Sequence, residues 1–163
     1  MLISCKADDQ KLLANCLGKR LEGLIAYKQP SIATYDLILL QFDNGWNLTL
    51  QLEAIDIAPK FEVFLIQVSQ SKPYDALFGY DKFTLGDFQV KEIDIVRRLE
   101  WIEGEAFEPT HETDVDAGLF IRSSNGTELK IEADPFPLAF QLEFIAIGSG
   151  KLEKSQHQLI PVV

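Results

Sequence analysis

Apolar and polar side chains alternate along much of this chain over short runs, a pattern typical of β-strands. The clearest case is residues 37–52, where two apolar runs flank Asn44-Gly45. Both residues of such a pair can take a positive φ, so the pattern strongly predicts a β-hairpin. A two-residue loop would place Gln41 opposite Leu48. The core face of this predicted hairpin then carries Leu37, Leu39, Trp46, Leu48, Leu50 and Leu52.

The first strand of this hairpin is apolar on both faces. Its other face would carry Ile38, Leu40 and Phe42, and it needs a cover to keep it from water. A short helix predicted over residues 8–17 supplies one, with an aspartate at its N-cap and apolar residues at helical spacing. We expect this helix to lie over that face or to protect a sheet edge.

The remaining elements are also predicted to be strands, separated by Pro-rich and Gly-rich turns. Residues 70–88 read as a connector and residues 149–163 as a polar tail. In the longest strand, Ile93, Ile95, Leu99 and Trp101 alternate on one side. The predicted strands outside the first hairpin cover residues 20–28, 61–69, 90–103, 119–133 (a second hairpin) and 138–147.

The two halves of the chain resemble each other. Asn125-Gly126 follows Asn44-Gly45 by 81 residues, and the strands around the two turns align in order. The chain is therefore predicted to be mainly β, as one domain over 1–163. We expect two duplicated four-strand antiparallel units, residues 19–69 and 97–147, packed as one sandwich or partly open barrel with one N-terminal helix. The core side of the second hairpin should carry Phe120, Leu129 and Ile131.

Charge narrows the range of functions. The chain has 163 residues and a formal net charge of −10, which argues against a nucleic-acid binder, because that function needs clustered Lys and Arg. No apolar run is long enough for a membrane-spanning helix. Two cysteines do not make a disulfide framework, so a cytoplasmic location is expected. Between residues 100 and 116 there are seven acids and no base.

Motifs for catalysis and cofactor binding are absent from the sequence, so no enzyme activity, metal or cofactor is predicted. There is no hydrolase nucleophile motif, no complete phosphate-binding loop and no dinucleotide fingerprint. A loose divalent-cation site around His111, using Glu112, Asp114 and Asp116, would make a metal-assisted enzyme the third choice. A solvated acidic segment is the simpler interpretation.

The leading hypothesis is a non-enzymatic protein that binds a basic partner, for example an immunity-type inhibitor of a basic toxin. A second hypothesis is a small apolar ligand held between the two units. A homodimer formed through an edge strand is compatible with either. The residues expected to contact the basic partner are Glu103, Glu105, Glu108, Glu112, Asp114 and Asp116.

Overall fold

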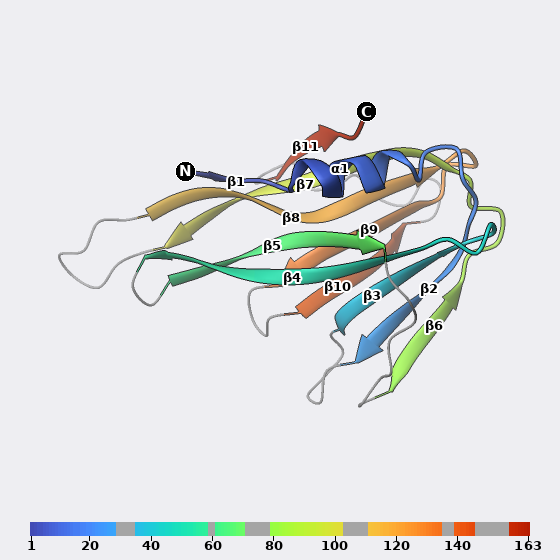
Figure 1. The fold of residues 1–163 in the computed structure, drawn as a ribbon, viewed down its shortest axis with the longest axis horizontal. Helices are drawn as coiled ribbons and strands as arrows, with labels where there is room; N and C mark the ends of the chain where they lie inside the picture. The colour runs from blue at the N-terminus through green and yellow to red at the C-terminus, as the bar shows by residue number, and fades with distance from the viewer. Residues whose placement is uncertain (29–34, 59–60, 71–78, 103–110, 135–138, 146–156) are drawn as a thin grey trace.

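The protein folds as eleven β-strands and one short helix in the part of the chain that the computed structural model describes (Figure 1). That part comprises residues 1–28, 35–58, 61–70, 79–102, 111–134, 139–145 and 157–163. The mainly β class is confirmed. The elements are β1 (Leu2–Ile3), α1 (Ala7–Ala14), β2 (Leu21–Lys28), β3 (Tyr35–Phe42), β4 (Asn47–Ala58), β5 (Phe61–Gln70), β6 (Tyr80–Thr84), β7 (Val90–Ile102), β8 (His111–Ser123), β9 (Glu128–Asp134), β10 (Ala139–Ile145) and β11 (His157–Pro161).

The strands form two antiparallel sheets that together curl into a half-barrel (Figure 1). One has the order β6-β2-β3-β4-β5 and the other β11-β7-β8-β9-β10, with the short β1 parallel to β8. Single pairs join them, Tyr35 with Phe140 and Arg20 with Gln89. Each sheet contains four consecutive strands in up-and-down order, β2–β5 and β7–β10, as expected for the two units. Their origin by duplication stays a prediction.

The loop of the first hairpin has three residues, not two. The Phe42 amide donates to the Trp46 carbonyl at 3.0 Å, and the Gly45 amide donates to the Phe42 carbonyl at 3.0 Å. Gly45 has φ of 76°, the left-handed conformation that closes a three-residue hairpin loop. Leu40 therefore pairs with Leu48, and the predicted register was wrong by one residue.

This one-residue shift exchanges the faces of β3, because side chains alternate along a strand. Ile38, Leu40 and Phe42 lie in the main core, where the two-residue loop predicts Leu37 and Leu39. Those two leucines are buried instead in a separate small cluster on the other side of the sheet. The faces predicted for the first strand were therefore wrong, although Leu48 and Leu50 of β4 are in the core as predicted.

The second hairpin deviates from the prediction in the same way. The Ser123 amide donates to the Thr127 carbonyl at 2.9 Å, and Gly126, with φ of 87°, ends another three-residue loop. Phe120 consequently pairs with Lys130 and is buried outside the main core, whereas Leu129 and Ile131 lie inside it. The same correction thus applies 81 residues further along the chain.

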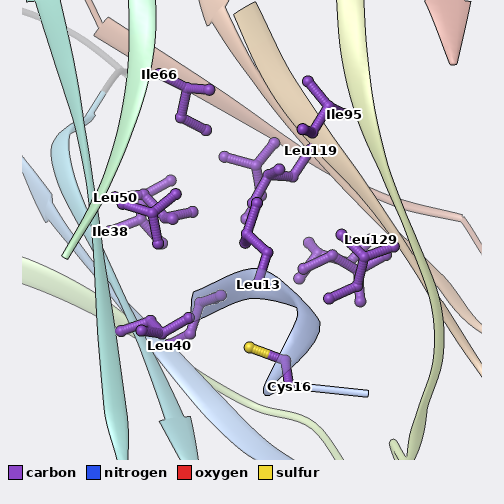
Figure 2. Close-up of a cluster of buried hydrophobic side chains, with 14 of the residues drawn as sticks. Leu13, Cys16, Ile38, Leu40, Leu50, Ile66, Ile95, Leu119 and Leu129 are labelled. Carbon is purple, nitrogen blue, oxygen red and sulfur yellow. The ribbon is translucent and has the colours of Figure 1, made fainter. Parts of the chain in front are cut away.

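Helix α1 lies across the open side of the half-barrel and inserts Leu13 into the core. Figure 2 shows Leu13 among Ile38, Leu40 and other aliphatic side chains from both sheets, so the helix covers the face that needed it. It begins one residue before the first aspartate, and no side chain caps it. Asp9 instead accepts the Val68 amide of edge strand β5 at 3.1 Å, which protects that edge.

Three further predictions need correction. A bulge between Val96 and Arg97 shifts the alternation of β7, so Leu99 is 39% exposed and not in the core. The connector contains strand β6, which pairs with β2. The predicted polar tail contains strand β11, whose Ile160 packs against the core. The side chain of Trp101 lies outside the described residues.

Replacing Leu13 by Ala should destabilise the protein by about 2–5 kcal/mol, because the change leaves a cavity that several strands line. Leu12→Ala is the matched control, since Leu12 is only partly buried on the same helix and should cost clearly less. Urea unfolding followed by circular dichroism gives both values. Equal losses for the two variants would contradict the placement of Leu13 in the core.

Candidate functional site

The side chain of Asp116 is fully buried where the N-terminal segment meets β8. One carboxylate oxygen accepts from the Arg97 Nε at 2.7 Å, and the other accepts the Cys5 amide at 2.8 Å. Hydrogen bonding to Asp116 raises the pKa of Arg97. All of these contacts are internal, so Asp116 is not part of the exposed surface that a partner could reach.

The same segment connects β8 to β5. The Cys5 thiol donates to the Ile66 carbonyl of β5 at 3.5 Å, while the Cys5 amide is held by Asp116 of β8. Burial raises the pKa of the Cys5 thiol to about 12, and the nearby Asp116 and Asp9 carboxylates contribute in the same direction. Cys5 is therefore a neutral thiol at physiological pH and lacks the character of a nucleophile.

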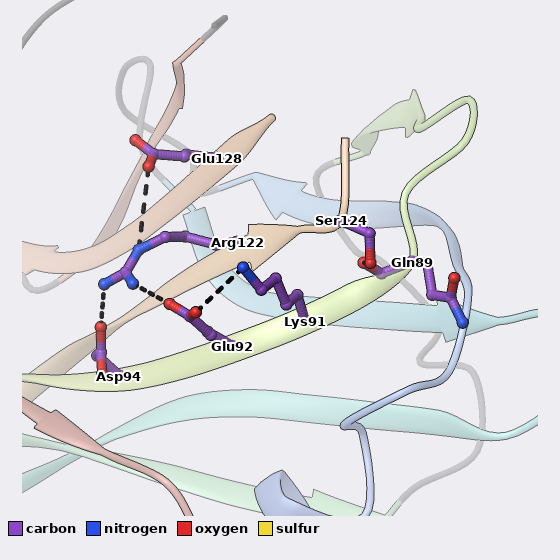
Figure 3. A network of polar contacts seen from close by, with 7 residues as sticks. All are labelled: Gln89, Lys91, Glu92, Asp94, Arg122, Ser124 and Glu128. Atoms are coloured by element: carbon purple, nitrogen blue, oxygen red, sulfur yellow. Dashed lines mark hydrogen bonds and ion pairs between the residues drawn. The ribbon is translucent and has the colours of Figure 1, made fainter. Parts of the chain in front are cut away.

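Carboxylates on the body of the second sheet are neutralised by arginines. Arg122 of β8 makes ion pairs with Glu92 and Asp94 of β7 and lies 3.9 Å from Glu128 of β9 (Figure 3). Lys91 adds a contact to Glu92 at 3.6 Å. The cluster joins three adjacent strands and offers no free carboxylate, which makes it a structural feature of the sheet.

Arg98 plays the same part further along β7. It contacts Glu100 and Glu132, and it donates to the Ala133 carbonyl at 2.9 Å. Glu100 belongs to the acidic stretch seen in the sequence, yet it is paired within the protein. The stretch is also not one loop, because residues 100–102 end β7 and residues 111–116 begin β8.

Four exposed carboxylates, which we call the acidic end, lie at the other extremity of the long strands. Asp56 of β4 and Glu62 of β5 are directly opposite each other. Glu112 and Asp114 are exposed at the start of β8. No ion pair is seen for any of the four within the described part of the chain.

The two pairs of carboxylates lie toward the same end because β5 and β8 run in the same direction. The N-terminal segment shows this: β1 is parallel to β8, and the segment passes Ile66 at Cys5 and Val68 at Asp9. Figure 1 shows both strands starting on the side where the N-terminus lies. The start of β5 and the start of β8 therefore form one extremity of the molecule.

The structure thus brings together two of the six predicted partner-binding residues, Glu112 and Asp114, and places Asp116 in the interior. Glu103, Glu105 and Glu108 lie outside the described residues. Sequence reasoning missed Asp56 and Glu62. A signal for them exists in the sequence, because Asp56 and Glu62 lie at nearly equal distances on either side of Pro59-Lys60, between two predicted strands that pair.

The described residues include no group of three or more His, Cys, Asp or Glu side chains arranged to hold a metal ion. The side chain of His111 is not among them. No helix in the described ranges is both long and apolar enough to cross a membrane. No protein-family model matches this chain, and no curated protein or solved structure matches it either.

Asp116→Ala should lower the free energy of unfolding by about 3 kcal/mol. The change leaves Arg97 and the Cys5 amide without their buried acceptor and loosens the contact between the N-terminal segment and β8. Asp114→Ala removes the same charge from an exposed position two residues away and should change stability by about 0.5 kcal/mol or less. Urea denaturation compares the two, and similar values would contradict a structural role for Asp116.

Both cysteines should resist thiol reagents in the native protein. Burial raises the pKa of Cys5 and of Cys16 from 9.0 to about 12, so at pH 8 the thiolate is far scarcer than in the unfolded chain. Since the folded state favours the neutral thiol, stability from this source is complete below pH 9 and falls as pH rises towards 12. Mass spectrometry after iodoacetamide treatment at pH 8, with and without urea, measures the difference; equal labelling would contradict the buried placement.

Proposed function

We propose that this protein is a non-enzymatic binding protein whose acidic end contacts a basic partner protein. The observation that carries the proposal is the direct cross-strand pairing of Asp56 with Glu62. Like charges at such a position destabilise a sheet, and both side chains are exposed without an ion pair among the described residues. A basic partner would relieve this repulsion on binding.

The contrast with the rest of the molecule supports the assignment. On the body of the second sheet, Asp116, Glu100, Glu132, Glu92 and Asp94 all contact arginines. These carboxylates are therefore paired on the body of the second sheet, whereas the four at the acidic end have no ion pair among the described residues. Lys60 lies outside the described residues.

The shape of the acidic end suits contact with another protein. β4 pairs with β3 only through residues 47–50, so the far part of the β4–β5 hairpin extends beyond the neighbouring strand. Leu2, Asp114 and Leu99 form one row across β1, β8 and β7, and both leucines are exposed, at 54% and 39%. Apolar side chains beside unpaired charges supply the two contributions a protein interface uses, buried area and electrostatic steering.

The net charge of −10 contributes at longer range. A single-sign field speeds the encounter with a partner of opposite charge, and salt screens it within about 10 Å at 0.1 M. Binding through the acidic end should therefore weaken steeply as salt is raised, chiefly through a slower association rate.

The experiment uses a triple variant, Glu62→Gln, Glu112→Gln and Asp114→Asn. Affinity capture from cell extract with wild type identifies the partner, and surface plasmon resonance then measures its affinity. We expect the purified partner to be basic and its affinity to fall by about tenfold or more in the triple variant, mainly in the association rate.

A matched control removes three exposed negative charges elsewhere, with Asp8→Asn, Asp43→Asn and Asp87→Asn. The control should bind like wild type, and equal losses in both triple variants would refute a localised acidic site.

Glu62→Gln alone should raise the free energy of unfolding by about 0.2–1 kcal/mol, since it removes the repulsion with Asp56. A destabilised Glu62→Gln protein would show that the pair is not repulsive.

A further inference from the structure

A groove of about 300 Å³ lies between the start of β2, the end of β3 and strand β6 with the turn that follows it. Arg20, Glu22, Gln41, Lys82 and Thr84 line it. This volume is at the lower limit for small-molecule sites in proteins. The groove plays no part in the proposed function, because it is at the opposite extremity from the acidic end (Figure 1).

Gly23 is one of the residues that line the groove. It pairs directly with Gln41 of β3 on one side and with Thr84 of β6 on the other. The central strand therefore has no side chain between those of Gln41 and Thr84. A Cβ at Gly23 would lie 2.4 Å from the Phe83 carbonyl oxygen, closer than any real contact. The close approach of the β2 and β6 backbones therefore requires glycine here.

The charges in this groove are exceptional for the molecule. The structure describes eleven of the fifteen Lys and Arg residues. Eight of these eleven make ion pairs with carboxylates, and Lys19 lies over the Trp46 ring at 4.0 Å. The remaining two, Arg20 and Lys82, have no such partner within the described ranges, and both line this groove.

Two unpaired cations in one groove stand out in a chain with 25 acidic residues. A lysine on an edge strand can serve merely to prevent strand pairing, which would account for Lys82 on β6. That explanation does not extend to Arg20, which bridges to Gln89 between the two sheets and yet lines the same groove. Glu22, also exposed and unpaired among the described residues, adds one acceptor there.

We propose that this groove binds a small molecule with a carboxylate or phosphate group. Arg20 and Lys82 hold the anionic group through charge-assisted hydrogen bonds, with the Thr84 hydroxyl as a further donor. Glu22 accepts a hydrogen bond from an ammonium or hydroxyl group of the same molecule. The ligand is thus an anion that also has a hydrogen-bond donor, such as an amino acid or a phosphorylated alcohol.

Nuclear magnetic resonance titration of the ¹⁵N-labelled protein tests the proposal with two probes, inorganic phosphate and L-glutamate, at constant ionic strength. We expect saturable shifts of the Gly23, Thr84 and Gly86 amides with at least one probe. Arg20→Gln and Lys82→Gln should each weaken binding by about tenfold or more. Lys11→Gln removes an exposed charge on α1 and should leave the affinity unchanged. The probe that binds more tightly identifies the anionic group.

Glu22→Gln tests separately how the groove binds the anionic group and the hydrogen-bond donor of the ligand. It should strengthen phosphate binding, because a negative charge leaves the groove, and weaken glutamate binding, because the acceptor for the ammonium group is lost. Shifts that rise linearly to millimolar concentrations with both probes would overturn the proposal. Equal affinity of wild type, Arg20→Gln and Lys82→Gln would overturn it as well.

Discussion

The fold depends on how the open side of the half-barrel is closed. Curling two sheets towards each other leaves an edge of β5 beside β8, and exposed strand edges invite pairing with other chains. The N-terminal segment occupies this position: β1 pairs with β8, the Cys5 amide is accepted by Asp116, and Asp9 accepts the Val68 amide. We call this line between β5 and β8 the seam. Its backbone polar groups form hydrogen bonds within the chain, and α1 covers the open side with apolar side chains.

Closing the seam in this way fixes which carboxylates are available. Asp116 accepts from Arg97 and from the Cys5 amide, so its carboxylate is committed to contacts in the interior. Glu112 and Asp114 lie on the same strand, four and two residues nearer its start, and make no ion pair among the described residues. Parallel running of β5 and β8 then brings Glu62 to the same extremity. The acidic end is in this sense a consequence of the seam: both halves of the chain contribute to it, and neither half alone would make it.

Alternating patterns were sufficient to predict most strands and the order of the two four-strand units, since each strand buries apolar side chains. They were insufficient for register. Asn44-Gly45 and Asn125-Gly126 each favour a two-residue loop, but the chain forms three-residue loops that end in a left-handed glycine. The bulge at Val96 likewise moved Leu99 out of the core. Such choices are made by tertiary packing, and short-range sequence preferences differ too little to decide them.

The candidate sites were harder to predict because they depend on contacts between distant segments. Local charge density in the sequence pointed equally to Glu112, Asp114 and Asp116. Asp116, however, is buried and accepts the amide of Cys5, which lies 111 positions earlier in the chain. Conversely, Arg20 and Lys82 are ordinary surface residues in the sequence, separated by 62 positions. They stand out only in the folded chain, because nearly every other described lysine and arginine makes an ion pair with a carboxylate. In an acidic protein the informative charges are therefore those that folding leaves unpaired and brings together: the four carboxylates of the acidic end, and the two cations of the groove.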